Sequence, residues 1–173
     1  MPTFNYRTAP TSFKLAATGF LLLAVLGLGV AGLQVYARAG LTPHSTLAHF
    51  RGDEETLQYP MSFALMVENA HAHAFTQPML ALLLSVALVV SNAREWLKRA
   101  AVIALFVGMT MELGVPWLVR YGPAWTVHLL PLTAVLITSG LFASVAVPLY
   151  EMWWEPEPAE AAAARPVMRR RIG

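Results

Sequence analysis

The stretch MSFALMVENAHAHAFTQPMLALLLSVALVV (Met61–Val90) decides the fold of this chain. It is long enough to cross a bilayer as a helix, which takes about 20 predominantly apolar residues. Glu68 is its only charged residue, yet two histidines and a glutamine follow within the span Glu68–Gln77. We therefore expect a membrane helix that carries a polar site in one half of its length.

The composition of the whole chain agrees with a membrane protein. Of its 173 residues, 57% are hydrophobic and only 13% are charged, a balance that excludes an ordinary soluble domain. The absence of cysteine excludes disulfides, thiolate metal sites, iron–sulfur clusters and covalent haem attachment. The formal net charge is only +2 and basic residues sit in short flanks, so no nucleic-acid partner is expected.

Four apolar segments predict an all-α fold, an integral membrane four-helix up-down bundle over residues 13–150. The predicted spans are 13–36, 61–90, 100–119 and 125–150, with an outer loop at 37–60. Residues 1–12 form the predicted N-terminal flank, and 151–173 form the tail. The first span is followed by ARAG, which resembles a signal cleavage site. Its apolar run is long for a signal peptide, and we expect it to be retained.

Basic residues near the helix ends set the expected orientation. They gather in the N-terminal flank, in the turn after the second span and in the tail, which share one side of a four-span bundle. These residues are Arg7, Lys14, Arg94, Lys98, Arg99, Arg165, Arg169, Arg170 and Arg171. We therefore expect a multi-pass protein of the bacterial inner membrane, with both termini cytoplasmic and the 37–60 loop periplasmic.

Polar groups from three predicted helices lie at a similar depth. At about 1.5 Å per residue, Glu68, His71 and His73 lie roughly 10–18 Å inside the outer face. On the same scale, Glu112 lies about 12 Å inside and His128 about 7 Å. Ionisable groups in a membrane mostly face the bundle interior or a functional site, so this shared depth predicts one polar layer.

Helical geometry divides the second span into two polar faces. Glu68 and His71 are three residues apart and share one face. His73 lies about 200° around the helix from His71 and shares the other face with Asn69 and Gln77. The two histidines therefore cannot chelate one ion together, and which face meets His128 stays open.

A pair of histidines on diagonal helices suits a bis-imidazole b-type haem. In an up-down bundle the second and fourth helices are diagonal, so His71 or His73 is expected to face His128 across the core. Glycines of the first span either make room for such a ligand or allow close helix packing. These glycines are Gly19, Gly27, Gly29 and Gly32.

Three prolines are expected to interrupt the helices beside the polar layer. Pro78, Pro116 and Pro131 each lack a main-chain donor and so free the carbonyl four residues earlier. Broken helices at membrane depth favour a bundle that opens around a ligand or water.

Other roles remain open for the polar residues. Glu68 and Glu112 are candidates for orienting a histidine, for handling protons or for binding metal. Copper, zinc or iron bound by His71, His73 or His128 is the alternative to haem. Glu68–His71 matches one E-x-x-H of a di-metal bundle, but the second copy is missing. The loop histidines, His44 and His49, are ordinary solvated residues or a lid over the site.

The runs ENAHAHAFTQPMLALLL, LAHFRGDEE and VPLYEMW resemble a group of small bacterial four-span membrane proteins with an H-x-H motif in helix 2. The AHAH helix is also similar in look to stand-alone relatives of the haem–copper oxidase catalytic subunit. Only His71 and His73 match the shared motif, and the chain lacks the helices and copper-binding histidines of an oxidase. The resemblance implies an association with membrane electron transfer rather than oxidase activity.

The sequence thus predicts a haem b subunit that transfers electrons between the quinone pool and a periplasmic redox partner. The expected partners are the lipid bilayer, quinol and a periplasmic cytochrome or larger redox complex, in a homo- or hetero-oligomer. An accessory or electron-transfer subunit is favoured over a stand-alone enzyme. The alternatives are a non-haem metal protein and a structural or assembly subunit without a cofactor of its own.

Overall fold

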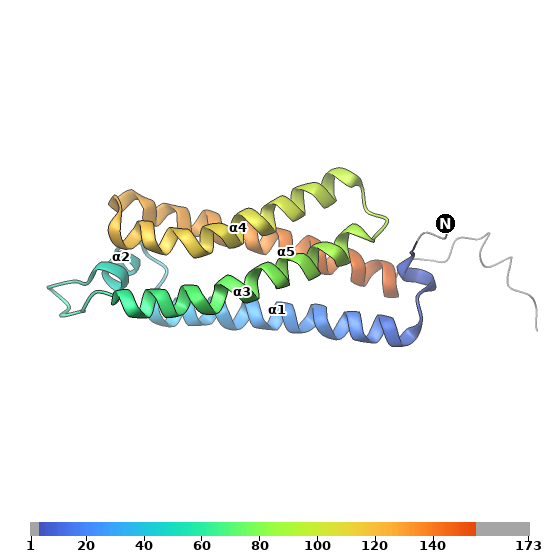
Figure 1. Ribbon diagram of the computed structural model, residues 1–173, viewed down its shortest axis with the longest axis horizontal. Helices are drawn as coiled ribbons and strands as arrows, with labels where there is room; N and C mark the ends of the chain where they lie inside the picture. Colours follow the sequence, from blue (N-terminus) through green and yellow to red (C-terminus); the bar gives the residue numbers. More distant parts are fainter. Residues whose placement is uncertain (1–3, 155–173) are drawn as a thin grey trace, which may run out of the picture.

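A computed structural model of the chain describes residues 4–154. Its elements, in chain order, are η1 (Tyr6–Thr8), α1 (Thr11–Ala39), α2 (Pro43–Arg51), α3 (Phe63–Val89), α4 (Glu95–Tyr121), η2 (Ala124–His128) and α5 (Leu129–Trp153). Four segments are long and apolar enough to span a membrane: α1, α3, α4 and η2 with α5. They run side by side along the long axis (Figure 1). The predicted all-α four-helix membrane bundle is therefore confirmed.

The bundle has two distinct ends (Figure 1). The α2 end holds α2 and the loop that leads to α3. The terminal end holds η1, the α3–α4 turn and the end of α5. The first described residues and the end of α5 thus meet at one end, as an even number of crossings requires.

The densest packing joins α3, α4 and α5, which contact one another. Gly108 of α4 and Gly140 of α5 allow close approach, because an added Cβ would lie 2.8 Å from Ile137 Cγ1 and 2.7 Å from Leu105 Cγ, respectively. The expectation that the second and fourth spans lie diagonally apart is wrong, since α3 contacts α5 directly. The physical reason is that these glycines and the small buried Ala81 of α3 draw three helices together.

The first span lies at the margin of this group. Within α1 only Leu21 and Ala39 are buried, and the helix contacts α5 and α2. A Cβ added at any of its four glycines would meet nothing within 4 Å. These glycines therefore pack against no other helix within residues 4–154, and lipid or another chain must cover this surface.

The loop between the first two spans contains a helix, α2, that was not predicted from the sequence. Thr42 and Ser45 form a reciprocal capping box and Pro43 occupies the first turn, so α2 has a well-formed start. Its last residue, Arg51, donates from Nε to Val119 O at 2.7 Å and from Nη2 to Gly122 O at 2.6 Å. These bonds satisfy carbonyls at the C-terminus of α4 and fix α2 against it.

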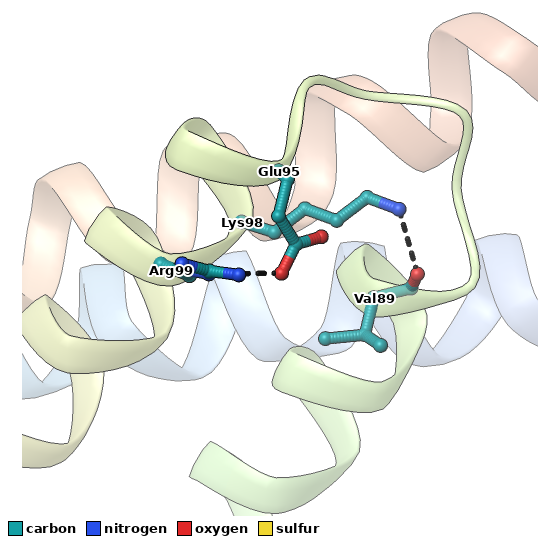
Figure 2. A network of polar contacts seen from close by, with 4 residues as sticks. All are labelled: Val89, Glu95, Lys98 and Arg99. Atoms are coloured by element: carbon teal, nitrogen blue, oxygen red, sulfur yellow. Dashed lines mark hydrogen bonds and ion pairs between the residues drawn. The ribbon is translucent and has the colours of Figure 1, made fainter.

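Side chains from other elements also satisfy the end of α3. This helix has no basic residue in its last turn and is followed by Val90 rather than glycine. Tyr6 Oη donates to Ala87 O at 2.6 Å, and Lys98 Nζ donates to Val89 O at 2.8 Å. Figure 2 shows the Lys98 ammonium reaching across the α3–α4 turn to that carbonyl.

The start of α1 is tied to the end of α5 in the same way. Lys14 Nζ donates to Met152 O at 3.0 Å, and Trp153 Nε1 donates to Thr18 Oγ1 at 3.0 Å. The Lys14 ammonium also lies 5.7 Å from the centre of the Trp153 ring. The marginal first span is therefore anchored by polar bonds at the terminal end.

The prolines have different local effects. Pro78 and Pro116 lie inside α3 and α4, which each continue through the proline as one helix, so the expected interruption is wrong at both positions. The expected interruption at Pro131 is wrong, because Pro131 lies in the first turn of α5, where a helix needs no main-chain donor. The change of helix type occurs three residues earlier, where η2 gives way to α5.

Candidate functional site

The histidine-bearing stretch of α3 is mostly exposed. From Val67 to Thr76 every residue is exposed except Ala70, which is half-buried. The part of α3 that follows is packed, because Gln77, Ala81 and Leu84 are buried against the other helices. The polar half of this span is therefore uncovered by the rest of residues 4–154, whereas its apolar half is part of the core.

Next to this stretch, one hydrogen bond between side chains joins α3 to α4. Gln77 Nε2 donates to Glu112 Oε2 at 2.8 Å. His73 lies near enough to interact electrostatically with the same carboxylate. The structure therefore brings together His73, Gln77 and Glu112, and it is the His73 face of α3 that looks towards α4. The carboxylate of Glu112 can accept a proton or hydrogen bonds from both partners.

A small cavity adjoins this contact. Its volume is about 50 Å³, and it lies between α3 and α4 beside Gln77, Pro78 and Thr110. Gln77 Oε1 is buried and has no hydrogen-bond partner among residues 4–154. The amide nitrogen of Gln77 thus donates to Glu112, while its carbonyl oxygen is an acceptor with no partner among residues 4–154.

The other face of α3 turns away from this contact. His71 is exposed and meets the ring of Phe75 on its own helix edge-on, with centroids 5.7 Å apart. Glu68 and Asn69 are exposed as well. No ion pair joins Glu68 to His71 in the part of the chain that the structure describes. Glu68 and His71 therefore share this face, as predicted, but no other helix within residues 4–154 covers them there.

His128 occupies the junction between η2 and α5. It is exposed and forms no side-chain cap on α5. The polar contact between α3 and α4 joins Gln77 to Glu112 instead. Among residues 4–154 no three His, Asp or Glu side chains come close enough together to hold a metal ion.

The two loop histidines lie on α2, at the α2 end of the bundle. His49 meets the ring of Phe50 edge-on, and burial together with the nearby Arg38 lowers the pKa of His49. His44 is exposed. The pKa of Asp53 is lowered by hydrogen bonds from the side chain of Thr56 and the main chain of Glu55. Both histidines therefore belong to the packing and charge pattern of the loop.

Several residues that hold the ends of helices in place were not predicted from the sequence. Arg51, Tyr6 and Lys98 satisfy helix ends from a distance, and Glu151 is buried at the terminal end. At the end of α3 the available signal was the lack of a glycine, since its carbonyls then need donors from elsewhere. The end of α4 carries Gly122, so no such signal pointed to Arg51. The choice of donor depends on tertiary contacts that no local pattern contains.

Comparison with known proteins gives one match. No curated protein and no solved structure matches the chain. The sequence model of the Aq_1264_TM family, described as a transmembrane helical domain, matches residues 40–159. The match takes in α2, α3, α4 and α5, which hold the polar stretch of α3 and its contact with α4. The chain therefore belongs to this family of transmembrane helical domains.

Proposed function

We propose that this protein is a membrane electron-transfer subunit that binds b-type haem through the histidines of α3. The observation that carries the proposal is the polar stretch from Val67 to Thr76, which has no buried face. Ionisable side chains cost about 2.5–3.5 kcal/mol each at the centre of a membrane helix on insertion scales. A flat, largely apolar group ligated by imidazole would cover this surface and satisfy a histidine nitrogen.

His73 is the residue that would hold the haem. Imidazole ligands usually donate their second N–H to a carboxylate, which fixes the ring and strengthens the donor nitrogen. Glu112 lies close to His73, and Gln77 holds the carboxylate from the side. His71 has the ring of Phe75 beside it rather than a carboxylate, so it is the second choice. His128, exposed where η2 meets α5, would be the other histidine available to hold the haem.

The membrane, orientation and partners belong to the same proposal. The distribution of basic residues favours the bacterial inner membrane, with both termini in the cytoplasm and α2 in the periplasm. The polar stretch would then lie in the periplasmic half, within reach of a periplasmic cytochrome or larger redox complex. Quinol would supply the electrons. The likeness of the AHAH helix to relatives of the haem–copper oxidase subunit points the same way.

A structural or assembly subunit is the second candidate function. The same uncovered stretch of α3 and the marginal position of α1 would also suit a partner chain in a larger complex. In that case the polar groups would hydrogen-bond to the partner and no cofactor would be involved.

The deciding experiment measures haem per chain in protein purified from its native membrane. We expect haem in the wild type, its loss in His73→Ala and its retention in His44→Ala, a matched change at an exposed loop histidine. Glu112→Gln should keep the haem but shift its midpoint potential, because the carboxylate acts through His73. Haem content that is unchanged in both His73→Ala and His71→Ala contradicts the proposed ligation. Haem-free wild type with weakened association in the histidine variants favours the structural role.

A further inference from the structure

A pocket lies at the terminal end of the bundle, far along α3 from the histidines. Its volume is about 270 Å³, and it opens between the α3–α4 turn and the last turns of α5. The residues that line it are Asn92, Ala93, Ala146, Val147, Tyr150 and Glu151. One side is therefore polar and formed by a turn, and the other is an apolar wall along a membrane helix.

Glu151 supplies the polar part of this pocket. Its side chain is only 5% exposed, and Oε1 accepts the main-chain N–H of Asn92 at 2.8 Å. Its other oxygen, Oε2, is buried and has no hydrogen-bond partner in the described part of the chain. A carboxylate oxygen in this position normally requires a donor, because leaving it unpaired is costly.

Nearby cations do not supply that donor among the described residues. Arg7 and Lys98 both lie near enough to interact electrostatically with Glu151, but neither hydrogen-bonds to its Oε2. The Lys98 ammonium donates instead to the main-chain carbonyls of Val89 and Ser91. Figure 2 shows it directed to Val89. The local ion pair of Glu95 with Arg99, 3.0 Å between Oε1 and Nε, is formed on α4 itself. Oε2 is therefore an acceptor that no donor within residues 4–154 satisfies, and a bound ligand can supply one.

The remaining features define the chemistry of that donor. The apolar wall of Ala146, Val147 and Tyr150 leads from Glu151 along α5 into the membrane span, so the ligand has an apolar part. Arg94 is exposed in the same turn as Asn92, where it can meet an anion. A lipid with a primary ammonium, a phosphodiester and an apolar tail matches these features. The ammonium would pair with the carboxylate of Glu151, the phosphodiester with Arg94 and the tail with the apolar wall.

We infer that this pocket binds the headgroup of a phosphatidylethanolamine-type lipid. The ammonium donates to Glu151 Oε2, the phosphate lies beside Arg94 and the first part of an acyl chain covers Val147. The quaternary ammonium of a choline lipid has no N–H to donate, and a glycerol headgroup has no positive charge. The site is independent of the haem proposal, because it lies at the other end of the bundle and uses none of the same residues.

The test compares lipid retention by native mass spectrometry on the full chain, delipidated and then supplied with one lipid at a time. Phosphatidylethanolamine should be retained about tenfold better than phosphatidylcholine or phosphatidylglycerol, as one charge-assisted hydrogen bond implies. Glu151→Gln should remove that preference. Glu95→Gln, an exposed carboxylate one helix away, should keep it.

A second variant guards against a folding defect in Glu151→Gln, whose carboxylate also holds the α3–α4 turn. Ala146→Leu fills the pocket without touching the carboxylate and should weaken phosphatidylethanolamine retention to the level of the other lipids. Equal retention of all three lipids by the wild type overturns the inference. Free phosphoethanolamine that displaces the lipid at equal concentration overturns the role of the apolar wall and hence the assignment to a lipid.

Discussion

A double-mutant cycle on Gln77 and Glu112 measures the one side-chain bond between α3 and α4 at the proposed site. The bond is 2.8 Å long, from Gln77 Nε2 to Glu112 Oε2. The variants are Gln77→Leu, Glu112→Leu and the double variant. Leucine keeps the side-chain bulk and removes the hydrogen-bonding groups, so the cycle isolates the pairwise contribution.

The expected coupling energy is about 1.5 kcal/mol. Hydrogen bonds between helices in membranes contribute about 0.6 kcal/mol on average and at most about 1.7 kcal/mol in measured cycles. A carboxylate acceptor places this bond near the upper end, because charge-assisted bonds are roughly twice as strong as neutral ones. Glu112 is half-buried, which limits screening of the interaction.

The assay is reversible unfolding in mixed micelles, followed by circular dichroism as the denaturing detergent fraction rises. A parallel cycle on Glu112 and Tyr6 serves as control. Tyr6 donates to Ala87 O at the terminal end of the bundle, whereas Glu112 lies near the middle of α4, so the two sites share no partner and their effects should add within about 0.5 kcal/mol. A Gln77–Glu112 coupling no larger than this control would refute the contact and, with it, the support for His73.

Three further predictions concern helix ends and packing. Tyr6→Phe should cost about 1 kcal/mol through the lost bond to Ala87. Burial raises the pKa of Tyr6 to about 12, because ionised Tyr6 is disfavoured in the fold. Apart from the hydrogen bond, the wild type should therefore lose up to about 3 kcal/mol of folding stability as the pH rises from 10 to 12. The phenylalanine variant should lack that alkaline loss in a pH series of unfolding midpoints. Arg51→Met should cost about 1–3 kcal/mol and raise amide exchange at the end of α4, since it removes two bonds to carbonyls. Gly140→Ala should destabilise by about 1–3 kcal/mol because its Cβ would meet the α4 backbone at 2.9 Å, whereas Gly114→Ala, with nothing within 4 Å, should be neutral or slightly stabilising.

The sequence was a good guide to the membrane fold, because hydrophobic length is a local property. The predicted second span, 61–90, lies within one or two residues of α3 at each end. The third span was predicted from residue 100, but α4 begins at Glu95. A charged, amphipathic first turn continues that helix beyond the apolar segment, which hydropathy cannot detect.

Helix neighbours could not be predicted from spans alone. A symmetric square of four helices was the simplest expectation, yet Gly108 and Gly140 bring α4 and α5 close together and α3 joins them. Glycines in α1 were the more conspicuous feature of the sequence but contact nothing. Which glycine is packed depends on the surface that faces it, and this is a tertiary property.

The candidate site was predicted in part. Placing His73 and Gln77 on one face followed from helical geometry, and their proximity to Glu112 on α4 agrees with the predicted common depth. The uncovered state of the whole stretch was not foreseen, because depth along the membrane normal gives no information on which helix faces lie inside. Glu151 was overlooked because it stands at the edge of a span, where charged residues are common.

The most direct test of the central claim is a reduced-minus-oxidised absorption spectrum of the full chain purified from its native membrane. A low-spin haem b ligated by imidazole predicts a sharp α band and a strong Soret difference, with a pyridine haemochrome that identifies protohaem. The same preparation of His73→Ala should lose these bands. A featureless Soret region in the wild type, at a protein concentration where one haem per chain is readily detected, would contradict the account.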